Sequence, residues 1–217
     1  IISKQKPGIT QVAFISSKEL RQGRPPKPAP YDYKNKTYGP WAVFFDPMEQ
    51  RFDENSKLIT VDGLPGIGKN KFCKELAEEL EMIHYPPMTF DSMYIDNQGF
   101  DYRTLNPKIP EDAQYFDLND YFRNPKGTNS TAIQVHMFMM RYLTYIDALA
   151  HIFNTGQGVV LDRSPWTDLV FAKAMRACGH ISPLGFDYYW SCYDNCLHRL
   201  LRPHVSIYLD APVEMAM

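Results

Sequence analysis

The segment Leu58-Ile59-Thr60-Val61-Asp62-Gly63-Leu64-Pro65-Gly66-Ile67-Gly68-Lys69-Asn70 decides how this chain folds. An apolar strand-like run leads into a glycine-rich turn and then into a helix-prone run over 69–81, which reproduces the GxxxxGK spacing in its expected setting. The glycines let successive backbone N–H groups converge on phosphate oxygens, and the lysine reaches the terminal phosphates. The predicted phosphate-binding residues of this loop are Gly63, Gly66, Gly68 and Lys69.

The residue after the lysine departs from the usual loop. That position ordinarily supplies a Ser or Thr hydroxyl to Mg²⁺, whereas Asn70 offers an amide that ligates the metal less readily. The loop therefore predicts phosphate binding and at the same time argues against metal-dependent phosphoryl transfer.

Composition excludes several classes of protein. The chain has 217 residues with 23 Lys and Arg against 25 Asp and Glu, so it predicts one soluble domain with an extension and gives no support for a nucleic-acid partner. No run approaches the roughly 20 apolar residues of a membrane-spanning helix, so no transmembrane segment is predicted. The 4 cysteines are too few for a disulfide scaffold and favour a reducing compartment.

We expect residues 1–57 to form an extended, basic and proline-rich arm. Prolines from Arg24 to Pro30 restrict the backbone and remove hydrogen-bond donors, which favours an extended segment. The aromatic run Tyr38 to Phe45 is too hydrophobic for a solvated linker. It is expected to pack on the core of its own domain, and the alternative is a contact with another subunit.

From residue 58 to residue 217 the pattern alternates strands with helices, which predicts an α/β fold: a three-layer, P-loop kinase-like parallel sheet with helices on both faces. The stretch 91–129, rich in Pro, Asp and Asn, is expected to be an irregular insertion with one short helix at 118–123. The predicted strands are 58–62, 83–86, 159–162 and 205–210, and the predicted helices are 69–82, 133–153, 167–178 and 186–200.

A second polar group ends the strand at 159–162. The triplet Asp162-Arg163-Ser164 follows an apolar run, and ligands of open α/β sheets bind beyond the carboxyl ends of the strands. Asp162 is a candidate ligand for Mg²⁺ or its waters, and Arg163 is a candidate clamp for phosphate. The alternative is a helix-capping Asp beside a surface Arg.

The two motifs together resemble the deoxynucleoside kinase family, which pairs a glycine-rich loop with a Glu-Arg-Ser triplet at the end of a later strand. The resemblance covers residue 58 onward and implies that Gln134, Arg141 and Asp168 read the base of a nucleoside. Taken without the family, Gln134 and Arg141 are ordinary polar residues of a helix surface.

Departures from the kinase pattern indicate a fold without turnover. The family carries a catalytic glutamate at the end of its second strand, where this chain reads Tyr85-Pro86-Pro87, and Asp91 is the nearest carboxylate that could replace it. The family's arginine-bearing lid lies beyond the strand that ends here at Asp210, outside the sequence given. The alternatives left open are an active mitochondrial deoxynucleoside kinase and a nucleotide-sensing module.

Three further blocks are similar to a subfamily, the deoxynucleoside-kinase-like accessory subunits of mitochondrial complex I (the alpha subcomplex subunit 10 family). These blocks are Tyr38 to Trp41, Thr155 to Leu161 and Arg202 to Asp210. The resemblance implies a non-catalytic, peripheral subunit on the matrix side of the inner membrane, in contact with subunits of the membrane arm. It implies no required cofactor and a possible bound nucleotide, with or without Mg²⁺.

Overall fold

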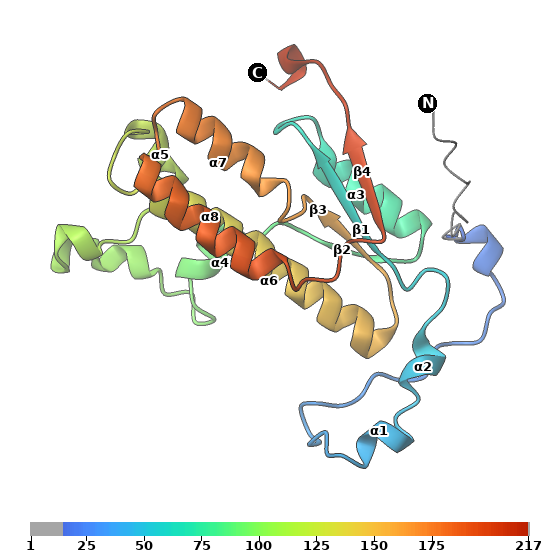
Figure 1. The fold of residues 1–217 in the computed structure, drawn as a ribbon. Coiled ribbons are helices and arrows are strands. Elements are labelled where there is room, and N and C mark those ends of the chain that lie inside the picture. The colour runs from blue at the N-terminus through green and yellow to red at the C-terminus, as the bar shows by residue number, and fades with distance from the viewer. Residues whose placement is uncertain (1–14, 217) are drawn as a thin grey trace, which may run out of the picture.

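The computed structural model describes residues 15–216, which build a parallel sheet flanked by helices (Figure 1). Its strands are β1 (Leu58–Gly63), β2 (Ile83–Tyr85), β3 (Val159–Asp162) and β4 (Val205–Leu209). Their order is β2-β3-β1-β4, and each neighbouring pair is parallel. All four predicted strands are confirmed to within about a residue at each end.

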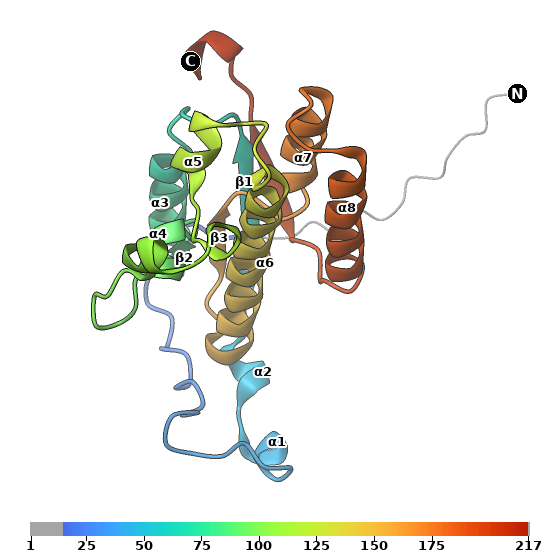
Figure 2. The same cartoon turned by 90° about the vertical axis from the view of Figure 1, so that its left-hand side faces the viewer.

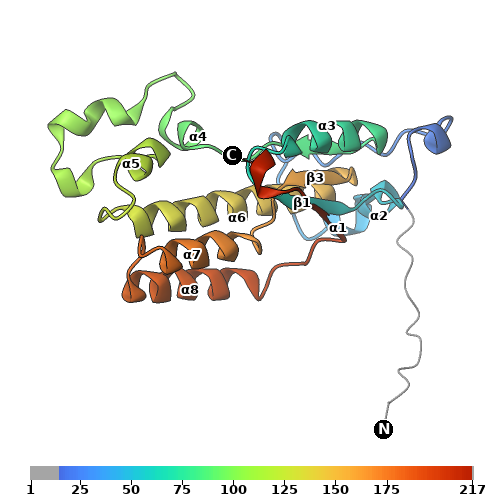
Figure 3. The same cartoon turned by 90° about the horizontal axis from the view of Figure 1, so that it is seen from above.

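Helices cover both faces of the sheet, as predicted (Figure 3). On one face α3 (Lys69–Glu79) packs Cys73 and Ala77 on Ile59 and Val61 of β1. On the other face α6 (Ser130–Thr155) packs against Leu58, Val159 and Leu161. Successive strand residues point to opposite faces, so a strand buried on both sides is apolar throughout. The three-layer arrangement is therefore confirmed.

Two more helices lie beyond α6. α7 (Asp168–Ala177) and α8 (Pro183–Leu197) pack on it through a buried cluster that includes Phe138 and Tyr189. α8 begins three residues before the predicted start because the Ser182 hydroxyl accepts from the backbone N–H of Gly185 and Pro183 occupies the first turn.

The insertion is more ordered than predicted. It contains α4 (Phe90–Tyr94), η2 (Tyr102–Lys108), η3 (Glu111–Ala113) and α5 (Leu118–Arg123), of which only α5 was expected. Thr89 and Asp117 each form a capping box, and this local side-chain chemistry starts a helix despite the many Asp and Asn residues. The insertion packs on α6 through Phe90, Tyr94 and their neighbours.

The described part of the arm is fixed to the domain by charged side chains. Arg21 pairs with Glu81 at 2.8 Å, and the Lys27 ammonium donates to the Gly156 carbonyl oxygen at 2.6 Å. Within the arm, both cations also reach the Asp53 carboxylate at 2.8 Å. Burial alone would raise the pKa of Asp53, but the hydrogen bonds from these two cations outweigh it and lower that pKa to about 2. The proline-rich segment 24–30 has no helix or strand, and the arm also holds η1 (Glu19–Arg21) and the one-turn helices α1 (Ala42–Phe45) and α2 (Met48–Arg51).

The expectation that the aromatic run covers the core of its own domain is wrong. Trp41, Phe44 and Phe45 are 75%, 77% and 81% exposed. Figures 1 and 2 show α1 at the end of the arm, away from the sheet. The arm residues before residue 15, including Lys4 and Lys6, lie outside the described part of the chain. Among the described residues, no helix combines the length and the apolarity needed to cross a bilayer.

Candidate functional site

The glycine-rich loop after β1 has the backbone shape that phosphate binding requires. Gly66 and Gly68 both have φ of +81°, and Gly68 is the residue from which α3 starts. This left-handed backbone favours glycine. Gly63 is held by a close approach, because a Cβ placed on it would lie 2.7 Å from the Leu209 carbonyl oxygen of β4.

Lys69 lies folded back over the loop. Its ammonium donates to the Leu64 carbonyl oxygen at 2.7 Å, and the residue is buried. Burial, followed by repulsion from Arg163, lowers the pKa of Lys69. Asn70, by contrast, is exposed. The loop therefore offers one buried cation and a helix start to an anion.

The triplet after β3 is locked onto the loop. Arg163 adopts the left-handed region at φ of +77°, its backbone N–H donates to the Val61 carbonyl at 2.9 Å, and its guanidinium donates to the Gly63 carbonyl at 3.2 Å. Asp62 accepts from the Ser164 N–H at 3.0 Å and from the Thr167 hydroxyl at 2.6 Å. These contacts bring the two predicted motifs together at the carboxyl ends of β1 and β3.

Gln134, Arg141 and Asp168, which the family resemblance grouped, also meet. Asp168 is fully buried and forms an ion pair with Arg141. Its other oxygen accepts from the Gln134 amide and from the Tyr189 hydroxyl, each at 2.7 Å. Asp168 therefore orients the two residues that face the cavity, and its carboxylate is engaged within the protein.

Two arginines share one aromatic ring. The guanidinium carbons of Arg163 and Arg141 lie 4.6 Å and 5.3 Å from the ring centroid of Phe171. Burial, and then repulsion from Arg163, lowers the pKa of Arg141 to about 10, and burial lowers the pKa of Arg163. With Lys69 nearby, a bound anion would relieve the cost of keeping these cations charged in a sheltered site.

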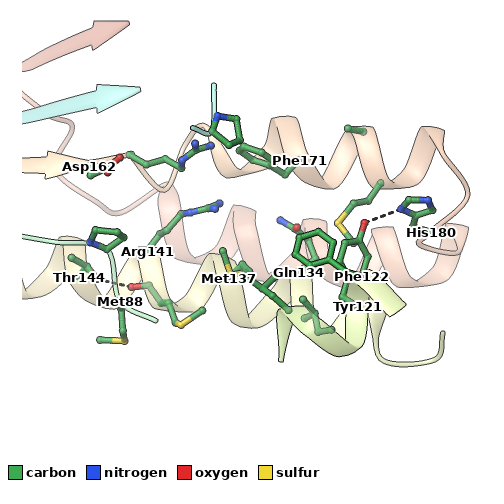
Figure 4. A pocket seen from close by; sticks show the side chains of 18 of the residues that line it. Met88, Tyr121, Phe122, Gln134, Met137, Arg141, Thr144, Asp162, Phe171 and His180 are labelled. Carbon is green, nitrogen blue, oxygen red and sulfur yellow. Dashed lines mark hydrogen bonds between the residues drawn. The ribbon is translucent and has the colours of Figure 1, made fainter. Parts of the chain in front are cut away.

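These residues line a cavity of about 670 Å³ between the phosphate loop, α5, α6 and α7 (Figure 4). Lys69, Arg163 and Arg141 lie toward its polar end, and Gln134 presents the only side-chain amide in its lining among the described residues. Tyr121 of α5 is hydrogen-bonded to His180 at 2.8 Å across the other end. The apolar lining is supplied by Pro65, Pro87, Met88, Leu118, Phe122, Ile133, Met137, Met140, Leu161, Phe171, Ala174 and Met175.

Of the two carboxylates considered from the sequence, one lines the cavity and the other does not. Asp162 lines it, but the described residues contain no cluster of three potential metal ligands from His, Cys, Asp and Glu around it. Asp91 is 66% exposed in its side chain, pairs with Arg103 at 2.7 Å, and is outside the cavity lining of the described residues. The hypothesis that Asp91 replaces the missing catalytic glutamate thus loses its geometric basis.

Sequence reasoning missed Asp62, Phe171 and Tyr189. Asp62 stood within the quoted loop and ends a buried strand, which is a usable signal for a structural carboxylate. Phe171 and Tyr189 read as core residues of amphipathic helices, and only the packing of α7 and α8 on α6 shows their contacts with the charged groups.

An open parallel sheet, a glycine-rich loop after its central strand and cations at the carboxyl ends define the class of α/β domains that bind phosphates at a P-loop. A family model described as deoxynucleoside kinase matches residues 59–217, and the chain belongs to that family.

Among curated proteins, the chain is 37% identical over 179 residues to the Bos taurus NADH dehydrogenase [ubiquinone] 1 alpha subcomplex subunit 10, mitochondrial, covering 81% of this chain and 51% of that protein. It is 37% identical to the Mus musculus protein of the same name, covering 79% of this chain and 48% of that protein. The chain thus spans about half the length of these relatives. The resemblance read from the sequence is confirmed.

Kinases are also similar. A Dictyostelium discoideum deoxyguanosine kinase is 40% identical over 93 residues, which is 43% of this chain and 32% of that protein. Among solved structures, a deoxyadenosine kinase from M. mycoides with bound dATP superimposes with a TM-score of 0.52 at 17% identity, covering 74% of this chain and 67% of that one. This likeness confirms the fold.

Proposed function

We propose that this chain is a non-catalytic accessory subunit of mitochondrial NADH:ubiquinone oxidoreductase, complex I, with a structural or assembly role. We place it on the matrix side of the inner membrane, as a peripheral subunit in contact with the membrane arm. The similarity to the two alpha subcomplex subunit 10 proteins supports the assignment. We also propose that the chain divides into an arm over 1–57 and a kinase-like domain over 58–217.

One observation carries the non-catalytic part of the proposal: the anion cradle is complete while the groups for turnover are missing. Lys69 and Arg163 stand at the loop, but the next residue is the exposed amide Asn70. β2 ends at Tyr85 and is followed by two prolines, which cannot accept a proton. General bases contribute roughly 10²–10⁴-fold to such reactions, so losing one together with the metal hydroxyl abolishes useful rates.

We propose further that the cavity binds a nucleoside or nucleotide that stabilises the folded chain and is not a substrate of any reaction. Its phosphates would contact Gly63, Gly66, Gly68, Lys69 and Arg163, and its base would face Gln134 and Arg141. Asp168 would act as a positioning residue, and Asp162 would be the ligand for any accompanying Mg²⁺. Arg141 and Gln134, fixed by the buried Asp168, support a base-recognition role because their orientation is set before a ligand arrives.

The assembly role is tested by separating gently solubilised native complexes by size and following this chain together with NADH dehydrogenase activity. Co-migration with that activity is expected. Migration as a free monomer or dimer would overturn the subunit assignment. Ligand retention is tested separately, because a nucleotide that binds the folded chain in excess must raise its melting temperature.

The competing function is an active mitochondrial deoxynucleoside kinase that transfers phosphate from ATP. The identity to the D. discoideum deoxyguanosine kinase favours it over part of the chain. Magnesium-dependent phosphorylation of a deoxynucleoside by the purified chain, lost in Lys69→Ala, would establish it. Absence of product while nucleotides still raise the melting temperature would support a binding role.

A further inference from the structure

The arm ends in a closed loop whose two ends are fastened by one buried side chain. Arg51 is 1% exposed, and its guanidinium donates to the Ala29 carbonyl at 3.2 Å and to the Asn154 carbonyl at 3.0 Å. It also forms an ion pair with Asp46. Residues 30–45, which we call the arm tip, are therefore held at a fixed place beyond the end of α6 (Figure 2).

The arm tip presents aromatic side chains outward. Trp41, Phe44 and Phe45 are exposed to the extents given above, and Val43 is 63% exposed. Three tyrosines of the arm tip also cluster, with ring centroids 4.8–5.8 Å apart. These are Tyr31, Tyr33 and Tyr38. Aromatic side chains in this position offer a large apolar area and lose little rotamer entropy when they are buried. Tyrosine and tryptophan also carry one polar group, which suits them to an interface between an apolar phase and water.

The exposed charged side chains of the arm tip give it a small net positive charge. Lys34 and Lys36 are exposed. Asp32 is also exposed, and the hydrogen bond from the Asn35 amide at 2.9 Å lowers its pKa, so its negative charge remains. The carboxylate of Asp46 is paired with the buried Arg51. Two lysines and one aspartate give residues 30–45 a net charge of +1, whereas the chain as a whole carries −2.

This combination selects a lipid surface over a protein surface. Three exposed aromatic side chains offer roughly 150–250 Å² each, about 450–750 Å² together. A stable protein interface buries about 800 Å² on each partner. Tryptophan and tyrosine concentrate at the headgroup level of bilayers, apolar side chains enter the acyl boundary, and lysines attract anionic headgroups.

We propose that the arm tip is a membrane-interface anchor that inserts Trp41, Phe44 and Phe45 into a bilayer rich in anionic phospholipid. This inference does not rest on the proposed role in complex I, since it is argued from the exposed surface of residues 30–45 alone. It gives a chain whose described helices do not cross a bilayer a means of lying against one.

The test is flotation of the full chain with vesicles at about 0.1 M salt, where surface charges still act over about 10 Å. One set is pure phosphatidylcholine, and the other contains one third anionic phospholipid. We expect roughly fivefold tighter binding to the anionic set, since a net charge of one near the surface contributes about 1 kcal/mol. Lys34→Glu with Lys36→Glu should abolish this preference.

A matched pair of variants separates insertion from unspecific stickiness. Phe44→Ser with Phe45→Ser should lower binding at least about tenfold, because two exposed aromatic groups no longer enter the acyl boundary. Leu184→Ser removes a 79% exposed apolar side chain from α8 and should leave binding unchanged. Equal loss in both would overturn the proposal, as would failure of the unaltered chain to bind anionic vesicles.

A second measurement reports on position without depending on the serine variants. Brominated lipid acyl chains quench tryptophan that enters the bilayer. Quenching should be strong in the unaltered chain and should fall sharply in Trp41→Phe, while Trp166 and Trp190 remain. Quenching that is the same in both proteins would show that the arm tip stays in water and would assign this surface to a protein contact instead.

Discussion

The close contact between the Arg51 backbone and Gly156 can be tested directly with Gly156→Ala. Gly156 ends α6 at φ of +69°, and a Cβ built there would overlap the backbone carbonyl of Arg51. An alanine in this backbone region costs roughly 1–2 kcal/mol. Overpacking against fixed backbone adds roughly 1–3 kcal/mol, which brings the expected loss to roughly 2–5 kcal/mol.

The chain supplies a control that isolates the second effect. Gly179 has nearly the same backbone, at φ of +71°, and a Cβ there meets nothing within 4 Å. Gly179→Ala should therefore lose only the backbone strain, roughly 1–2 kcal/mol. The difference between the two variants measures the contact between α6 and the arm.

The assay is urea and thermal unfolding followed by circular dichroism. For a chain of this size 1 kcal/mol corresponds to about 2–4 °C in melting temperature, so Gly156→Ala should lower the midpoint by about 4–20 °C and Gly179→Ala by about 2–8 °C. Equal losses at the two positions would refute the placement of Arg51, because backbone strain alone would then account for both.

Three further results are expected. Asp168→Asn should lower the free energy of unfolding by about 3 kcal/mol or more, because it leaves Arg141 buried without its ion pair; a urea midpoint close to that of the unaltered chain would contradict this. The pKa of Asp53 lies below its ordinary value, at about 2, so the contribution of Asp53 to the free energy of unfolding is complete above about pH 4 and is lost as the pH falls toward 2. Asp53→Asn should therefore flatten the fall in stability over that interval, and an unchanged acid unfolding curve would count against it. Burial raises the pKa of the Cys73 thiol to about 12, so iodoacetamide at pH 8 should label the exposed Cys178 in the folded chain and Cys73 only after unfolding, as mass spectrometry of peptides would show.

The fold was readable from sequence where local signals and tertiary demands agree. β1 and β3 are mostly apolar until their terminal aspartates because both faces are covered, and the glycine spacing fixes the turn that follows β1. The start of α8 was misplaced because a Ser-Pro pair, which nucleates a helix, was read as loop. The arm tip was misjudged because hydrophobic sequence alone predicts burial, whereas Arg51 joins the base of that loop to the end of α6, away from the core.

The candidate site was predictable in part. Spacing indicated the anion cradle, and family resemblance grouped Gln134, Arg141 and Asp168, yet neither distinguishes a side chain that faces a ligand from one that holds its neighbours. The full burial of Asp168 makes that distinction here. The roles in nucleotide binding stay predictions.

The length of α6 has a mechanical consequence. The helix is 26 residues long, about 39 Å, and it carries Gln134 and Arg141 in its first half and the Asn154 carbonyl that receives Arg51 near its last turn. A tilt of only 3° about its first turn would displace the far end by about 2 Å, which is enough to break a hydrogen bond. A ligand in the cavity and a partner at the arm would thus contact opposite ends of the same rigid helix, so a tilt of α6 caused at one end would change the contacts at the other.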